Sequence, residues 1–130
     1  MSGDSRRIAF IVPGRPQSKQ RPRLGRGGRV YTPKATHRYE RSVASAFLVA
    51  TGGRRCAGYR GPVEMSIRCV YATMHRRDLD NVVKAVCDGL NGIAYADDCQ
   101  VVSIRAERCQ GAVECTEVEV CYPRPVQLAP

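Results

Sequence analysis

Acidic residues with a spacing that suits phosphodiester chemistry begin at Asp78 and Asp80. Both stand where a predicted helix begins, close to the partial positive charge of its first turn. Lys84 follows Asp80 by four residues, so the two side chains lie on the same face of that helix. Asp88 borders this face one turn later. The helix can therefore present several carboxylates and one amine on a single side.

Two further acids, Asp97 and Asp98, precede a predicted strand that could lie beside the start of the helix. Hydrolysis of a phosphodiester needs a nucleophilic water, charge neutralisation at phosphorus and help for the departing oxygen. Hard divalent cations such as Mg²⁺ supply all three, and their ligands are carboxylate oxygens and water. Without a cation, two unit charges about 4 Å apart repel by about 4 kcal/mol at an effective dielectric of about 20. Clustered acids therefore either bind cations or raise some of their carboxyl pKa values.

Simpler roles for each of these residues stay open at this point. Asp78 alone could be a helix N-cap, and Asp80 a favourable first-turn acid. Lys84 could be a solvated partner of Asp80, and Asp97 with Asp98 could form a turn. An Asp-x-Asp pair is a weak signal by itself. Residue types and spacing leave these structural roles and a metal site as alternatives.

The first half of the chain is strongly basic. Residues 1–77 hold 17 Lys and Arg against three acids, the rest holds four against nine, and the whole chain carries +9. Residues 13–29 are rich in Gly, Pro and basic residues without periodicity, which predicts an exposed arm or loop. A density of positive charge this high favours contact with a nucleic-acid backbone over a merely solvated face. The candidate DNA-binding residues are Arg15, Lys19, Arg21, Arg23, Arg26, Arg29, Lys34, Arg38, Arg41, Arg76 and Arg77.

Hydrophobic periodicity predicts four strands and two helices. Apolar and polar residues alternate over 62–72, which indicates a half-buried strand. Residues 79–90 return to a helical period, and Asn91-Gly92 ends that helix. An earlier helix starts at Thr32-Pro33 and ends at Gly52-Gly53. The other predicted strands are 6–12, 99–109 and 112–122, with Gln110-Gly111 as a hairpin turn between the last two.

This order of elements predicts an α+β fold. We expect a single domain over residues 1–130, with a mixed β-sheet, two main helices packed on it and loose ends at 1–5 and 123–130. No apolar run approaches the about 20 residues of a membrane span, and the N-terminus lacks a signal peptide, so a cytoplasmic protein without membrane contact is expected. The seven cysteines include no Cys-x-x-Cys pair, which favours reduced thiols over a disulfide or zinc framework.

Taken together, these motifs resemble the RusA family of structure-specific endonucleases. The resemblance is carried by R-R-D-L-D-N-V-V-K-A-V-C-D-G-L-N-G at 76–92 and by A-D-D-C-Q-V-V at 96–102. Upstream, V-P-G-R-P-Q-S-K-Q-R-P-R at 12–23 and V-Y-T-P-K at 30–34 also match. The resemblance covers most of the chain, from about Ile8 to Tyr122. The joint pattern of Asp-x-Asp-Asn-x-x-Lys with a later Asp-Asp-x-Gln-Val is fairly specific.

The resemblance implies a RusA-like fold and a homodimeric, Mg²⁺-dependent endodeoxyribonuclease in which Mn²⁺ can substitute. Such enzymes resolve Holliday junctions by paired symmetric nicks, in DNA recombination and repair, without a small-molecule cofactor. They are often carried by phages and prophages. The family's essential acids correspond to Asp78, Asp80 and Asp98 as metal ligands, and its essential lysine to Lys84. Asp97 and Asp88 match accessory acidic positions.

Two other functions remain as alternatives. A nuclease for flaps, forks or other branched DNA would use the same site on a different substrate. A non-catalytic DNA-binding or architectural protein could keep the fold, but it would be expected to lack one of the three aspartates, and all three are present. The arm over 13–29 varies among family members, so its DNA contacts are not carried over residue by residue.

Overall fold

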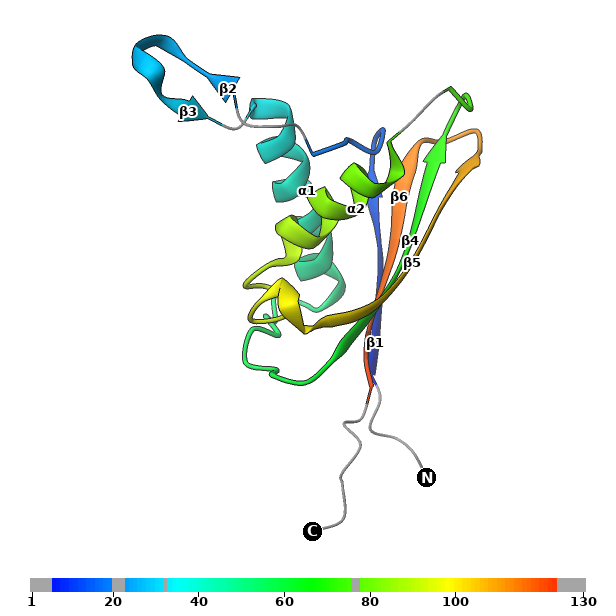
Figure 1. Ribbon diagram of the computed structural model, residues 1–130. Coiled ribbons are helices and arrows are strands. Elements are labelled where there is room, and N and C mark those ends of the chain that lie inside the picture. The colour runs from blue at the N-terminus through cyan, green and yellow to red at the C-terminus, as the bar shows by residue number, and fades with distance from the viewer. Residues whose placement is uncertain (1–5, 20–22, 32, 76–77, 124–130) are drawn as a thin grey trace, which may run out of the picture.

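A computed structural model describes residues 6–19, 23–31, 33–75 and 78–123 of the chain. Its main elements are a four-stranded sheet and two α-helices that lie on one side of it (Figure 1). The expected α+β class with a mixed sheet and two main helices is therefore confirmed. The ends expected to be loose fall outside the described residues, except for Pro123, which follows the last strand.

The sheet has the order β1-β6-β4-β5. Its strands are β1 (Arg6–Pro13), β4 (Val63–Tyr71), β5 (Val101–Gln110) and β6 (Cys115–Tyr122). β6 pairs antiparallel with both β1 and β4, while β4 and β5 run parallel. The parallel pair requires a crossover, which the chain makes through the second helix.

The predicted hairpin around Gln110-Gly111 is wrong. β5 and β6 are consecutive in the chain, but β4 lies between them in the sheet. The chain does reverse direction after β5, because β5 runs parallel to β4 and β6 runs antiparallel to it. The Gly111 N–H donates to the carbonyl of Tyr71 at 2.9 Å. This hydrogen bond joins the turn to the end of β4. The chain then crosses to the other edge of β4, where β6 pairs. A local turn signal specifies a reversal of direction but not the strand that will be the neighbour.

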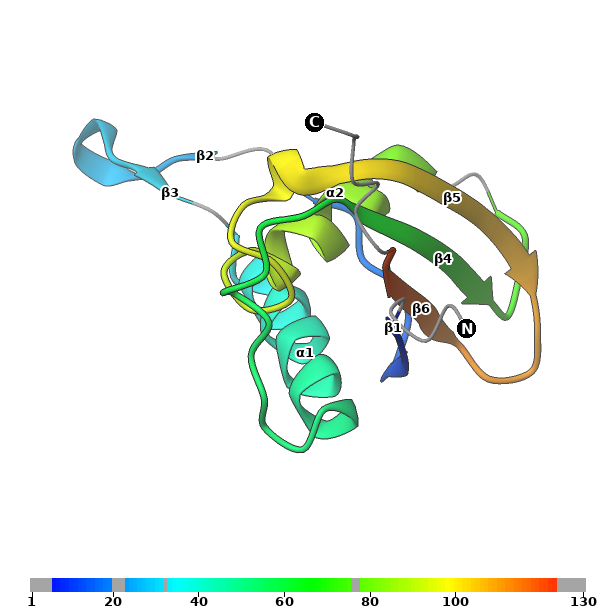
Figure 2. The same ribbon diagram turned by 90° about the horizontal axis from the view of Figure 1, so that it is seen from below.

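The helices α1 (Lys34–Ala50) and α2 (Leu79–Leu90) cover one face of the sheet (Figures 1 and 2). β4 alternates as predicted, with Met65 and Ile67 buried and Ser66 exposed. The core includes Val43 and Phe47 from α1 and Val82, Val86 and Leu90 from α2. Burial of these side chains at about 25 cal/mol per Å² of apolar surface is the main stabilising contribution.

The helix ends follow the sequence signals closely, with one difference. α2 has the predicted bounds, and Asn91 forms its C-cap, followed by Gly92 at φ 78°. α1 begins at Lys34, so Pro33 takes the N-cap position instead of the first helical one. The predicted cap, Thr32, lies outside the described residues.

Part of the predicted arm forms a small hairpin that projects from the body (Figure 1). It consists of β2 (Arg23–Leu24), the 3-10 turn η1 (Arg26–Gly28) and β3 (Val30–Tyr31). Gly27 and Gly28 have φ of 77° and 78° at the tip, a conformation that side chains with a Cβ rarely adopt. In this hairpin Val30 pairs with Leu24 and Tyr31 pairs with Arg23.

Candidate active site

The start of α2 carries Asp78 and Asp80 on the exposed surface. Asp78 occupies the N-cap position, but its carboxylate makes no capping hydrogen bond to the helix. It accepts instead a hydrogen bond from the side-chain amide of Asn81. The Asp80 carboxylate accepts one from the backbone N–H of Asn81 at 3.1 Å. Asp78 thus stands at the N-cap position, as one of the alternatives expected, but its carboxylate is bound mainly by the Asn81 side chain and can take a further ligand.

Asp78 and Asp80 titrate as a pair because their carboxyl groups are within hydrogen-bonding reach of each other. A hydrogen bond from the Asp80 carboxyl, together with the Asn81 amide, lowers the pKa of Asp78. The same hydrogen bond and the negative charge of Asp78 raise the pKa of Asp80. Two neighbouring carboxyls of this kind are a donor pair to which a divalent cation can bind in place of a proton.

The second acidic pair, Asp97 and Asp98, is held by the short 3-10 helix η2 (Asp98–Gln100). Asp97 is its N-cap, and its carboxylate accepts from the backbone N–H of Cys99 at 3.1 Å. That hydrogen bond, with a further one from the Asp98 carboxyl, lowers the pKa of Asp97. Asp97 is thus engaged in a structural cap, and the Asp98 carboxyl lies within hydrogen-bonding reach of it.

Gln100 attaches the η2 turn to the rest of the fold. Its side-chain Oε1 accepts from the backbone N–H groups of Ala96 and Asp97 at 2.9 and 3.0 Å. Its Nε2 donates to the carbonyls of Tyr59 at 2.9 Å and Gly61 at 3.0 Å. Four hydrogen bonds from one half-buried side chain fix where the acidic pair stands. The sequence pattern included Gln100 but gave it no role, because Tyr59 and Gly61, the partners that attach it to the fold, are about forty residues earlier in the chain.

Asp98 lies within electrostatic reach of α2. Burial raises its pKa, as do the Asp97 carboxyl and the negative charge of Asp88, whereas the positive charge of Lys84 lowers it. Lys84 Nζ is 3.9 Å from Asp88 Oδ2, and the Lys84 side chain is 61% exposed. Asp98, Lys84 and Asp88 therefore form one charged neighbourhood on the surface of α2, in which the approach of Lys84 to Asp88 is the part that the helical spacing predicted.

The structure brings the predicted acids together in pairs and not as one cluster. Within residues 6–19, 23–31, 33–75 and 78–123, no three acidic, His or Cys side chains form a ready-made cation site. The Asp78–Asp80 pair stands at the first turn of α2, while Asp98 faces the part of the helix that carries Lys84 and Asp88. The donor set still fits a hard cation, since it consists of exposed carboxylates, two of which, Asp78 and Asp80, lie within hydrogen-bonding reach of each other.

The basic residues predicted to bind DNA are spread over the arm and α1. Arg26 and Arg29 are exposed on the projecting hairpin, and Lys34, Arg38 and Arg41 are exposed on α1. Two other predicted DNA-binding residues in the described part, Arg15 and Lys19, form ion pairs with acidic residues. Arg15 forms an ion pair with Glu114, with Nε–Oε1 at 3.1 Å. Lys19 turns inward between the helices, toward Glu40 and Asp88.

Arg21, Arg76 and Arg77 lie outside the described residues. Arg23 is in β2, opposite Tyr31, and its side chain is not among those described.

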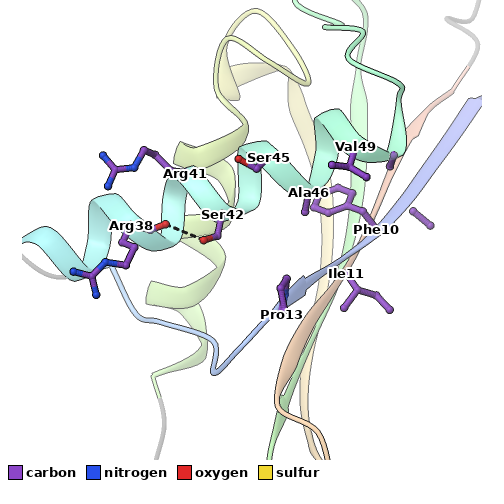
Figure 3. A pocket seen from close by; sticks show the side chains of 11 residues that line it. Phe10, Ile11, Pro13, Arg38, Arg41, Ser42, Ser45, Ala46 and Val49 are labelled. Carbon is purple, nitrogen blue, oxygen red and sulfur yellow. Dashed lines mark hydrogen bonds between the residues drawn. The ribbon is translucent and has the colours of Figure 1, made fainter.

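An apolar groove lies away from the acids, between β1 and α1 (Figure 3). It has a volume of about 620 Å³ and is lined by Phe10, Ile11, Ala46 and Val49, with Arg38 and Arg41 along its rim. None of the predicted catalytic residues lines it. The candidate site is instead an exposed polar surface, which suits a polymeric substrate that approaches from outside.

Comparison with known proteins gives two matches. The family model of endodeoxyribonuclease RusA matches residues 13–121 of the chain. A Bacillus subtilis protein, described as uncharacterized protein YqaN, is 32% identical over 126 residues, which cover 78% of this chain and 86% of the relative. The matched range includes the arm, both helices and all the predicted catalytic acids. Among the described helices, none is long and apolar enough to cross a membrane.

Proposed function

Since the chain belongs to the RusA family of endodeoxyribonucleases, we propose that it cuts Holliday junctions with Mg²⁺ held by Asp78, Asp80 and Asp98. The observation that carries this proposal is the exposed Asp78–Asp80 pair at the start of α2, whose carboxyl groups lie within hydrogen-bonding reach of each other. Mn²⁺ can replace Mg²⁺ with the same ligands. The action belongs to DNA recombination and repair in the cytoplasm of a bacterial or phage-infected cell.

The bound cation would supply charge neutralisation at the phosphate and lower the pKa of the attacking water. The chain's own residues would hold the cation and set the charge around it. Asp78 and Asp80 stand near the positive end of the α2 dipole, which favours their ionised forms. Asp98 adds a carboxylate from η2, and the Gln100 hydrogen bonds keep it in place. Asp97 and Asp88 play accessory roles by shaping the charge around Asp98.

Lys84 would stabilise negative charge that builds on the phosphate during cleavage. Its side chain is largely exposed, and its nearest carboxylate oxygen, on Asp88, is 3.9 Å away. That is longer than a charge-assisted hydrogen bond, so the ammonium is free to reach a phosphate oxygen. A preorganised donor of this kind typically contributes about 10²–10³-fold to the rate.

The basic hairpin and α1 would hold the DNA backbone. Arg26, Arg29, Lys34 and Arg38 are exposed and lie in the basic first half of the chain. Contacts of this kind release counterions, so affinity would fall with salt by a log–log slope of about −0.9 per phosphate on duplex DNA. Arg15, Arg21, Arg23, Arg76 and Arg77 belong to the same proposed surface.

The active form would be a homodimer. A four-way junction has approximate two-fold symmetry, so an isologous dimer presents two equivalent sites to two equivalent strands. Two such sites would produce paired symmetric nicks.

The substrate is tested with a panel of labelled synthetic DNAs in Mg²⁺. A four-way junction, a flap, a replication fork and a linear duplex of matched sequence are compared at equal concentration. The enzyme should make paired nicks in opposed strands of the junction and cut the duplex little. Cutting of the flap or fork alone would keep the active site and assign the enzyme to other branched DNA. Tight binding to the junction without any cutting would favour a non-catalytic DNA-binding protein.

A further inference from the structure

Lys19 belongs to the basic arm, but its side chain occupies the space between α1 and α2. Its Nζ lies 2.7 Å from Glu40 Oε2 on α1 and 3.1 Å from Asp88 Oδ2 on α2. Its backbone N–H donates to the carbonyl of Asn81, in the first turn of α2, at 2.8 Å. The side chains of Lys19, Glu40 and Asp88 are 23%, 17% and 22% exposed. Lys19 therefore joins the arm to both helices from a half-buried position.

The Lys19 ammonium forms ion pairs with the carboxylates of Glu40 and Asp88. Burial by itself acts to lower the pKa of Lys19, but the hydrogen bonds and negative charges of Glu40 and Asp88 outweigh it and raise the pKa. An ammonium in this position stays protonated and neutralises two half-buried acids that would otherwise repel each other. Such an ammonium cannot neutralise a DNA phosphate at the same time.

Lys19 and Lys84 share one carboxylate oxygen. Asp88 Oδ2 is 3.1 Å from Lys19 Nζ and 3.9 Å from Lys84 Nζ. If Lys19 were absent, that oxygen would have Lys84 as its nearest cation. Attraction would then draw the Lys84 ammonium to the short distance typical of a charge-assisted hydrogen bond, on the order of 2.8 Å. Lys84 would be held against α2 and not toward a bound phosphate.

We propose that Lys19 is a positioning residue for cleavage, which occupies Asp88 so that the Lys84 ammonium remains free to meet the phosphate. This inference rests on the proposed role of Lys84. It removes Lys19 from the DNA-contact surface predicted from the sequence. It also assigns Asp88 to the ion-pair network between the helices, where its carboxylate is bound by Lys19.

The test compares the full-length wild type with Lys19→Met, Lys19→Arg and the double variant Lys19→Met/Asp88→Asn. The cleavage rate of a four-way junction is measured with saturating enzyme in Mg²⁺, and junction affinity is measured over a salt series. Lys19→Met should lower the saturated rate by on the order of tenfold to a hundredfold, as expected when a catalytic group is misplaced by about 1 Å. The affinity and its salt slope should not change. Lys19→Arg should keep most of the rate.

The double variant separates positioning from a general loss of structure. Asp88→Asn removes the charge that captures Lys84, so the double variant should recover most of the rate lost in Lys19→Met. It leaves Glu40 as the one uncompensated carboxylate, where Lys19→Met leaves two, so it keeps the test decisive if Lys19→Met alone does not fold. A double variant no faster than Lys19→Met would overturn the proposal.

Lys34→Met is the matched control, because Lys34 is an exposed lysine on α1. Its loss should weaken the salt slope of junction binding by about 0.9, the value for one phosphate contact. If Lys19→Met behaves in the same way, Lys19 contacts DNA and the proposal is overturned. A wild type that fails to cut the junction would instead refute the proposed function, which distinguishes the two failures.

Discussion

Gly89 sets the distance between the two helices at the point where the charged network forms. A Cβ at this position of α2 would lie 2.8 Å from the carbonyl oxygen of Glu40 and 3.2 Å from both its Cα and the Cβ of Val43. The close neighbours are backbone and a buried side chain, so no flexible group can move aside. Gly89→Ala must therefore push α1 and α2 apart.

The expected change in unfolding free energy for Gly89→Ala follows from two opposing effects. Alanine is the better helix former by about 1 kcal/mol. Ordinary carbon contacts lie at about 3.5–4.0 Å, so relief of the clash requires a shift of roughly 0.5–1 Å. Overpacking of this kind costs about 1–3 kcal/mol, and contact with backbone places Gly89 at the upper end. The net expected loss is about 2 kcal/mol of unfolding free energy, or roughly 6–10 °C in Tm for a domain of this size.

The assay is urea denaturation and thermal unfolding of Gly89→Ala, followed by circular dichroism. Gly58→Ala is the matched control, because a Cβ there meets no atom within 4 Å and its φ is not in the left-handed region. The control should stay within about 1 kcal/mol of the wild type. A Gly89→Ala protein as stable as the wild type, or more stable, would refute close packing at this crossing.

Three further predictions concern the site and the arm. Replacing both Arg26 and Arg29 with Ser should weaken the salt slope of junction binding by about 1.8, the value for two phosphate contacts, in a fluorescence anisotropy titration; an unchanged slope would remove the hairpin from the DNA surface. Gln100→Ala should lower the unfolding free energy by about 2 kcal/mol in urea and slow cleavage, because four hydrogen bonds to backbone groups are lost; wild-type stability would contradict the role given to Gln100. The raised pKa of Asp80 means that this carboxyl keeps its proton to a higher pH than an ordinary aspartate, so a calorimetric Mg²⁺ titration should release more protons as the pH is lowered from neutral; release that persists unchanged in Asp80→Asn would place the proton elsewhere.

Local sequence signals predicted the elements that carry the site. α2 was predicted with its observed bounds because an amphipathic period runs between Asp78 and Asn91-Gly92, and both ends carry residues that interrupt a helix. β4 was predicted because its apolar residues alternate strictly. The order of the strands was not predicted. The neighbour of β6 is decided by burial against α1 and α2, which no turn sequence encodes.

The candidate site was predictable in its residue types more than in its arrangement. Helical spacing correctly put Lys84 near Asp88. The separation of the acids into two pairs depends on where η2 is attached, and Gln100 attaches it through Tyr59 and Gly61, about forty residues earlier.

The role of Lys19 could not be read from the sequence either. A lysine in a basic, Gly- and Pro-rich segment is indistinguishable there from its neighbours. Its inward direction depends on Glu40 and Asp88, which come together only because the helices approach closely at Gly89.

The most direct measurement is cleavage of a four-way junction by wild type and Asp80→Asn, in Mg²⁺ and in EDTA, with junction binding measured in parallel. The wild type should make paired symmetric nicks in Mg²⁺ and none in EDTA. Asp80→Asn should bind the junction as tightly as the wild type and leave it uncut, since the change removes a ligand charge and no DNA contact. Cleavage by wild type in EDTA, or undiminished cleavage by Asp80→Asn in Mg²⁺, would contradict a metal site built on the Asp78–Asp80 pair.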